Sequence, residues 1–179
     1  MRFTPRVQRL RLTWLLAPPF LLLARPTPPL LVAGALLALP GLLLRSWASG
    51  YIHKDTVLAV DGPFAQLRHP LYVGSFLVGL GLVLAAGRWV LLPAYLALFV
   101  LVYGRTLRQE EAELDRRFGS AHAEYRRRVP AFLPLPGRRW APWEAGTFKL
   151  RLYLRNREWE APLGVGAGFG LLALKMVLT

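Results

Sequence analysis

A histidine and a tyrosine lie where the chain turns from polar to apolar, in the string Arg68-His69-Pro70-Leu71-Tyr72-Val73-Gly74. Proline suits the first turn of a helix because its missing N–H has no partner there. The N–H groups after Pro70 are expected to be free and, with the helix dipole, to hold a carboxylate or phosphate oxygen. This string therefore predicts a ligand-binding helix N-terminus. Taken alone, His69 is more often a helix-capping or headgroup-contacting residue.

Two adjacent carboxylates, Glu110 and Glu111, lie in a segment with helical periodicity. At helical spacing, Glu111 shares one stripe with three apolar residues, Leu107, Leu114 and Phe118. A carboxylate in an apolar stripe requires a partner because burying an unpaired charge is costly. A ligand ammonium would suit Glu111, while Glu110 faces either the edge of the same pocket or water. Most such pairs of carboxylates on helices are simply solvated.

A third element is the segment 125–136, where a basic turn containing Arg126, Arg127 and Arg128 leads into a proline-rich strip. Extended proline-containing segments fold back over surfaces without needing sheet partners. This strip could therefore cap a cofactor pocket. An arginine run of this kind is more often an anchor for anionic lipid headgroups.

The elements that must position these residues are long uncharged segments. Five apolar stretches are predicted to be membrane helices, namely Leu10–Ala24, Pro29–Leu44, Leu71–Ala86, Trp89–Tyr103 and Pro162–Leu178. A membrane span needs roughly 20 predominantly apolar residues. Pro18 and Pro19 interrupt the first stretch and are expected to kink or split it. The fourth stretch continues as helix-forming sequence to Phe118, and Gly119 is expected to end the helix. The fold class is therefore an all-α polytopic membrane protein.

The charges predict how the helices are oriented. All Lys and Arg residues except Arg25, Arg88 and Lys175 lie in segments that this arrangement assigns to one side of the membrane. Because cytoplasmic loops carry an excess of basic residues, the N-terminus and the motifs are expected to face the cytoplasm. One membrane-embedded unit is predicted, with a hairpin over 1–48, a cofactor-binding core over 49–136, an interfacial segment over 137–161 and a last helix over 162–178.

Composition restricts the classes of function. The chain is 54% hydrophobic and carries a formal net charge of +13, which is typical of a membrane protein with dense arginine clusters rather than of a nucleic-acid-binding domain. It has no cysteine, which excludes thiolate metal sites, and its three histidines are not at metal-ligand spacing. The N-terminus superficially resembles a secretory signal, but Arg25-Pro26 follows in place of a small-residue cleavage site.

In combination, these motifs resemble a known family. The string Asp61 to Gly74, followed by Glu110-Glu111, Phe118-Gly119, Tyr125 and Val129-Pro130, is similar to the isoprenylcysteine carboxyl methyltransferases and their phospholipid methyltransferase relatives. The resemblance covers roughly residues 45–134. It implies an enzyme that binds S-adenosylmethionine at the cytoplasmic end of a helical bundle embedded in lipid.

The resemblance also implies roles for individual residues. The cofactor-binding residues that it implies are His69, Pro70, Tyr72, Gly74, Glu110, Glu111, Tyr125, Val129 and Pro130. The carboxylates would receive the amino group of the cofactor, Gly74 would allow close approach, and the last three would close over the adenosine. Arg105 or Arg108 could orient an acceptor carboxylate. No metal is implied.

The sequence does not identify the methyl acceptor. An arginine-rich, cysteine-free chain of this kind looks bacterial, so a bacterial cell membrane is the expected location and a prenylated protein is not the expected substrate. A carboxylate, amine or hydroxyl of an isoprenoid or phospholipid remains in question, and the number of copies in an assembly is not predicted. The alternatives are a membrane reductase related to the sterol reductases and a non-enzymatic membrane scaffold.

Overall fold

The computed structural model describes residues 17–53, 57–133 and 147–179, and the secondary structure in these ranges is helical. Residues 17–23 are helical. The further elements are α2 (Pro28–Ser49), the 3-10 turn η1 (Gly62–Ala65), α3 (Pro70–Ala85), α4 (Leu91–Phe118), α5 (Ser120–Arg128), α6 (Leu150–Arg155) and α7 (Glu160–Leu178).

The predicted membrane helices can be compared with these bounds. Helices α2, α4 and α7 are long and apolar enough to cross a membrane, and α3 is a shorter apolar helix of 16 residues. The prediction of an all-α polytopic membrane protein is confirmed. Of the first predicted span, residues 10–16 lie outside the described residues, while Pro18 and Pro19 lie inside a helical stretch.

Helices α2 and α3 pack antiparallel in direct contact through two pairs of glycines. A Cβ atom on Gly41 would lie 2.6 Å from the carbonyl oxygen of Gly74, and a Cβ atom on Gly81 would lie 2.5 Å from that of Gly34. Small residues at such contacts let helix backbones approach closely in lipid. The close approach that Gly74 permits is therefore to α2, which differs from the role that the family resemblance implies for it.

Helix α4 continues well beyond its apolar part. Its 28 residues span about 42 Å at 1.5 Å per residue. The helix ends at Gly119, whose φ of +50° is unfavourable for residues with a side chain, as the sequence predicts. One expectation is wrong here: Arg126 to Arg128 are the last turn of α5 and not a basic turn. A complete helix forms because no proline follows Gly119 before Pro130.

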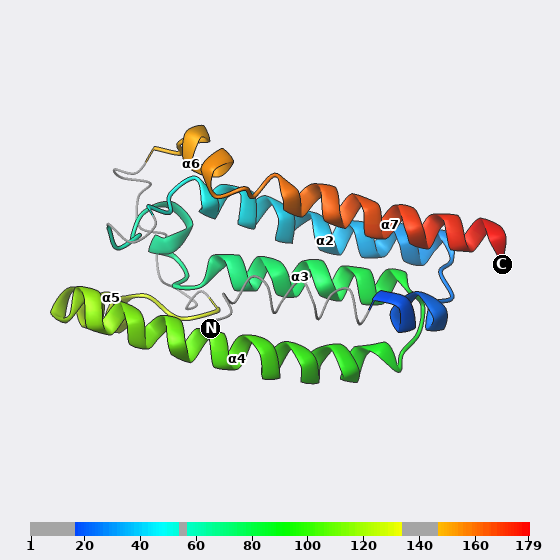
Figure 1. Cartoon of the computed structure of the whole chain (residues 1–179), viewed down its shortest axis with the longest axis horizontal. Coiled ribbons are helices and arrows are strands. Elements are labelled where there is room, and N and C mark those ends of the chain that lie inside the picture. The colour runs from blue at the N-terminus through cyan, green and yellow to red at the C-terminus, as the bar shows by residue number, and fades with distance from the viewer. Residues whose placement is uncertain (1–16, 54–56, 134–146) are drawn as a thin grey trace, which may run out of the picture.

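The bundle is polarised in charge along its length. Figure 1 shows α5 and α6 at one end, with the C-terminus of α7 and the α3–α4 connection at the other. At that second end, Lys175 Nζ donates to the carbonyl oxygen of Leu22 at 2.9 Å, and Arg88 Nε donates to that of Leu23 at 3.2 Å. Cations suit this position because the last carbonyl groups of a helix have no partners inside it.

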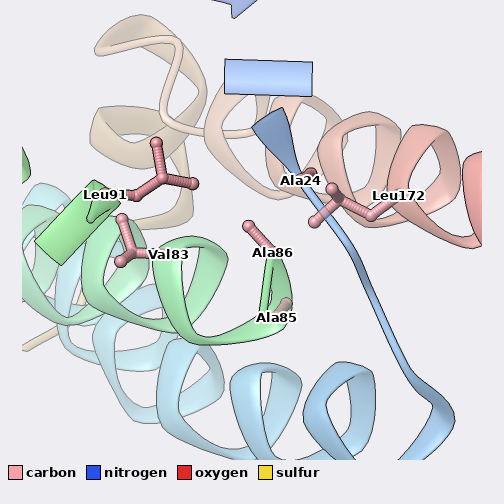
Figure 2. Packing of buried hydrophobic residues seen from close by; sticks show 6 residues of the cluster. All are labelled: Ala24, Val83, Ala85, Ala86, Leu91 and Leu172. Atoms are coloured by element: carbon pink, nitrogen blue, oxygen red, sulfur yellow. The ribbon is translucent and has the colours of Figure 1, made fainter. Parts of the chain in front are cut away.

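A small apolar core closes the same end (Figure 2). It joins the segment after the first helix to α3, α4 and α7 through six buried residues, Ala24, Val83, Ala85, Ala86, Leu91 and Leu172. The backbone N–H of Arg25 donates to the carbonyl oxygen of Ala86 at 2.7 Å. This end of the molecule is therefore held by packing, and the opposite end carries most of the ionisable groups.

The glycine contacts predict that Gly41→Ala lowers the melting temperature of the detergent-purified protein. The added methyl group would meet Gly74 O at 2.6 Å and Leu77 Cβ at 2.9 Å, and overpacking of this kind costs about 1–3 kcal/mol. Gly104→Ala is the control because nothing lies within 4 Å of its added Cβ. Equal melting temperatures for the two variants would show that α2 and α3 do not depend on this contact.

Candidate functional site

The carboxylate of Glu111 is the centre of the site. Arg68 Nη1 lies 2.6 Å from its Oε1 and 2.7 Å from its Oε2, and His69 Nε2 lies 2.7 Å from Oε1. Arg126 Nε approaches Oε2 at 3.5 Å. The side chains of Arg68 and Glu111 are 16% and 21% exposed, so this is a largely buried ion pair. The partner that the apolar stripe requires is therefore Arg68, which the sequence motif already contained beside His69.

Local backbone structure places His69 at the head of α3. Pro70 occupies the first turn and His69 is the N-cap residue, without a capping hydrogen bond from its side chain. The N–H groups of Tyr72 and Val73 donate to the carbonyl oxygen of His69 at 3.1 and 3.2 Å. The expectation that the amides after Pro70 are free is therefore wrong for these two, because the N-cap carbonyl accepts the first bonds of the helix.

The strip after α5, residues 130–132, binds the backbone at the start of α3. Arg68 N–H donates to Pro130 O at 2.9 Å, and His69 N–H donates to Ala131 O at 3.2 Å. The ring of Phe132 lies 5.8 Å from the ring of His69. The predicted folding back of the strip is thus observed for residues 130–132, while residues 134–136 lie outside the described residues.

Tyr125 and Val129 are buried at the base of this strip. The hydroxyl group of Tyr125 donates to Phe64 O at 2.7 Å, which ties α5 to η1, and burial raises the pKa of Tyr125. These two side chains fasten the strip to the core, and Pro130 contributes the carbonyl group that Arg68 binds. Tyr125 and Pro130 thus contact other parts of the protein.

Glu110 is the accessible carboxylate of the pair. It is exposed, and Tyr72 OH donates to its Oε2 at 2.6 Å. The Tyr72 ring packs between His69, at a centroid distance of 5.8 Å, and Tyr103, at 5.4 Å. Because Glu111 is neutralised by Arg68 and Glu110 is not, Glu110 is the better acceptor for an incoming ammonium group.

A second network extends from the site along α4 and α5. His122 Nδ1 lies 2.7 Å from Asp115 Oδ1, and Arg126 Nη1 donates to Asp115 Oδ2 at 3.0 Å. Since Arg126 also approaches Glu111, it links Asp115 to the centre. The corner between α4 and α5 is therefore held by ionic contacts, which the sequence motifs did not predict.

The surroundings of His69 favour its neutral form. Burial lowers its pKa below the ordinary 6.5, and this effect outweighs the hydrogen bond to Glu111 and the nearby carboxylate charges, which raise the pKa. In the neutral form, Nε2–H donates to Glu111 and Nδ1 is left without a proton.

Arg105 and Arg108 lie away from these contacts. Both are exposed on α4. A cavity of about 450 Å³ lies next to the site, and neither arginine lines it. Its lining residues come from α2, α3, α4 and α7, and its polar members are Arg45, Ser75, Tyr95, Tyr103 and Glu160. Arg45 is the arginine at this cavity, which sequence reasoning missed because it lies outside the motifs.

Fold and site together define a class of protein, a helical membrane protein with a carboxylate–arginine–histidine centre at the charged end of its bundle. Residues 42–121 match the phospholipid methyltransferase family. This match confirms the resemblance that the motifs predict. No solved structure matches the chain.

Three curated relatives share parts of this sequence. The nickel-cobalt-cadmium resistance protein NccN of Alcaligenes xylosoxydans xylosoxydans is 43% identical over 50% of this chain and 43% of its own length. The cobalt-zinc-cadmium resistance protein CzcN of Cupriavidus metallidurans is 40% identical over 60% of this chain and 50% of its own length. The protein-S-isoprenylcysteine O-methyltransferase of Schizosaccharomyces pombe is 35% identical over 46% of this chain and 35% of its own length. The chain spans half or less of the length of each relative.

The ion pair predicts that Glu111→Gln destabilises the fold. The substitution leaves Arg68 largely buried without its carboxylate, and breaking a buried pair costs about 3 kcal/mol or more. Glu113→Gln is the matched control, because Glu113 is 45% exposed and pairs with Arg117 on the surface of the same helix. Thermal unfolding measures the difference in stability between the two variants. An equal decrease in melting temperature in both would contradict the prediction.

The lowered pKa of His69 predicts a dependence of stability on pH. As pH falls below about 6.5, the unfolded chain takes up a proton on this histidine before the folded protein does, so stability decreases with acidification. In His69→Gln this contribution is absent, while the amide still offers a donor to Glu111. Between about pH 7.5 and pH 5.5, the melting temperature should fall more for the wild type. A larger fall in the variant would contradict the assignment.

Proposed function

We propose that this protein is an integral membrane methyltransferase that uses S-adenosylmethionine to methylate a lipid-soluble acceptor. The observation that carries the proposal is the meeting of the two motifs, in which Tyr72 binds Glu110 and both Arg68 and His69 bind Glu111. The family match over residues 42–121 and the similarity to an isoprenylcysteine O-methyltransferase support the same activity.

The residues present fit the charges of this cofactor. Glu110 offers an exposed carboxylate for the ammonium group, and the rings of Tyr72 and Phe132 beside His69 offer surfaces that attract a sulfonium cation. Arg68 Nε is buried and has no hydrogen-bond partner among the described residues, so a donor remains for an anionic or carbonyl oxygen. The bound cofactor would supply an electrophilic methyl group.

The protein's own task would be alignment and exclusion of water. Methyl transfer from a sulfonium is an in-line displacement, which needs the nucleophile, the methyl group and the sulfur on one line. The folded-back strip over His69 and the fixed head of α3 supply a rigid wall for such a geometry. No covalent intermediate with the enzyme is needed.

The cavity is the proposed site for the lipid chain of the acceptor. Its volume of about 450 Å³ lies in the range of small-molecule sites. It lies beside the proposed cofactor site, because Tyr103 lines the cavity and its ring contacts that of Tyr72. The reacting group, whether carboxylate, amine or hydroxyl, would lie where these two tyrosines meet.

The setting that we propose is a bacterial cell membrane with the site facing the cytoplasm. The described basic residues gather at the end of the bundle that carries α5, and Arg127 and Arg128 there are 76% and 70% exposed. Such residues would contact anionic lipid headgroups on the cytoplasmic side.

Two of the relatives are named as metal-resistance proteins. Among the described residues, no group of three or more His, Asp or Glu side chains could hold a metal ion.

Equilibrium binding of S-adenosylmethionine and S-adenosylhomocysteine to the detergent-purified protein tests this function. Glu110→Gln should weaken binding of both about tenfold or more, the magnitude expected for loss of a hydrogen bond to a charged group, with little change in melting temperature. Glu113→Gln should leave binding unchanged. Absence of saturable binding in a folded, monodisperse sample would contradict the proposal and would direct attention to a nicotinamide cofactor or a scaffold.

A further inference from the structure

Arg45 of α2 is a charged residue at an apolar cavity. Its side chain is 23% exposed, Nε donates to Glu158 Oε1 at 2.7 Å, and Nη1 donates to Ser75 Oγ and, at 3.5 Å, to Leu71 O. Nη2 has no hydrogen-bond partner in the described part of the chain. A guanidinium group this well buried needs an anion beside it, because desolvation of a lone charge is costly.

The anion that Arg45 meets comes from a distant part of the sequence. Glu158 lies between α6 and α7, and its side chain is 10% exposed. The neighbouring Asn156 fixes this segment to the end of α2, since its amide nitrogen donates to Ser49 O at 2.9 Å and to Ile52 O at 3.2 Å. The carboxylate of Glu158 therefore occupies the Nε edge of the guanidinium group.

Arg45 and Ser75 lie on the same cavity wall as the apolar side chains that would hold a lipid chain. Leu42, one turn before Arg45, and Val78, one turn after Ser75, line the cavity with them. An amphiphile with an apolar chain among these residues would bring its polar head to Arg45. A planar guanidinium group binds carboxylates and phosphates through two parallel hydrogen bonds.

We propose that Arg45 recognises the anionic head of a single-chain amphiphile lying in this cavity, and that the carboxylate of Glu158 is an internal occupant of the same position that the ligand displaces. The shared chemistry is an anionic oxygen pair, whether carboxylate or phosphate. This inference rests on the proposed function, because the amphiphile bound by Arg45 would be the methyl acceptor. The acceptor would then carry an acidic head group. Arg45 would be a positioning residue for that acceptor.

Binding of three labelled amphiphiles that share one oleoyl chain tests the proposal on the detergent-purified full chain. They are oleate, 1-oleoyl lysophosphatidate and uncharged mono-olein. Glu158→Gln removes the internal competitor and should raise the affinity for at least one of the two acids about tenfold, with no change for mono-olein. A gain for only one acid identifies the head group.

The double variant Arg45→Gln/Glu158→Gln keeps a neutral hydrogen-bonding pair and avoids an unpaired buried charge. Its affinity for the acids should fall to that for mono-olein, while its melting temperature stays near that of the wild type. Glu160→Gln is the control, because it also removes one carboxylate charge, here from the cavity lining, while leaving the contact between Glu158 and Arg45 intact. An equal gain in this control, or no gain for either acid in Glu158→Gln, would overturn the proposal.

Binding of S-adenosylmethionine, measured on the same samples, separates the two proposals. Acid-selective binding through Arg45 without cofactor binding would contradict the methyltransferase and leave the amphiphile site standing. Binding of S-adenosylmethionine without a preference for the acids over mono-olein would contradict the amphiphile site and leave the methyltransferase proposal standing.

Discussion

The Arg68–Glu111 ion pair fixes the geometry of the charged end. Glu111 lies on the part of α4 that continues beyond its apolar segment, and Arg68 lies just before α3. Because neither charge is fully solvated, each group requires the other, and this requirement holds α4 against the head of α3. The strip at Pro130 then binds the backbone of Arg68, so three distant segments depend on one carboxylate.

The rest of the bundle differs in how closely its helices approach. Glycines bring α2 and α3 into backbone contact, whereas large rings separate α3 from α4. The ring of Phe76 on α3 lies 5.9 Å from that of Tyr95 and 5.1 Å from that of Phe99, both on α4. Small residues allow contact between backbones and aromatic residues keep them apart. The cavity beside the proposed site follows from this difference.

The two carboxylates of the motif have different tasks because their surroundings differ. Glu111 is occupied by Arg68 and His69, so it serves to assemble the site. Glu110 is exposed and bonded by one tyrosine, so its charge is available to a ligand. One residue step along a helix turns a side chain by about 100°, which is enough to separate a structural role from a binding role.

The sequence by itself determined the long apolar helices α2, α3, α4 and α7, because apolar length, Pro70 at a helix start and Gly119 at a helix end act locally. It did not predict α5 or α6. It also determined the motif residues that meet, since the need of Glu111 for a partner was visible in its apolar stripe. Only the tertiary structure decided that the partner is Arg68, that Gly74 contacts α2, and that Arg45 lines the cavity and pairs with Glu158. These pairings join residues far apart in the chain, and no local pattern records which distant charge is closest when the helices pack.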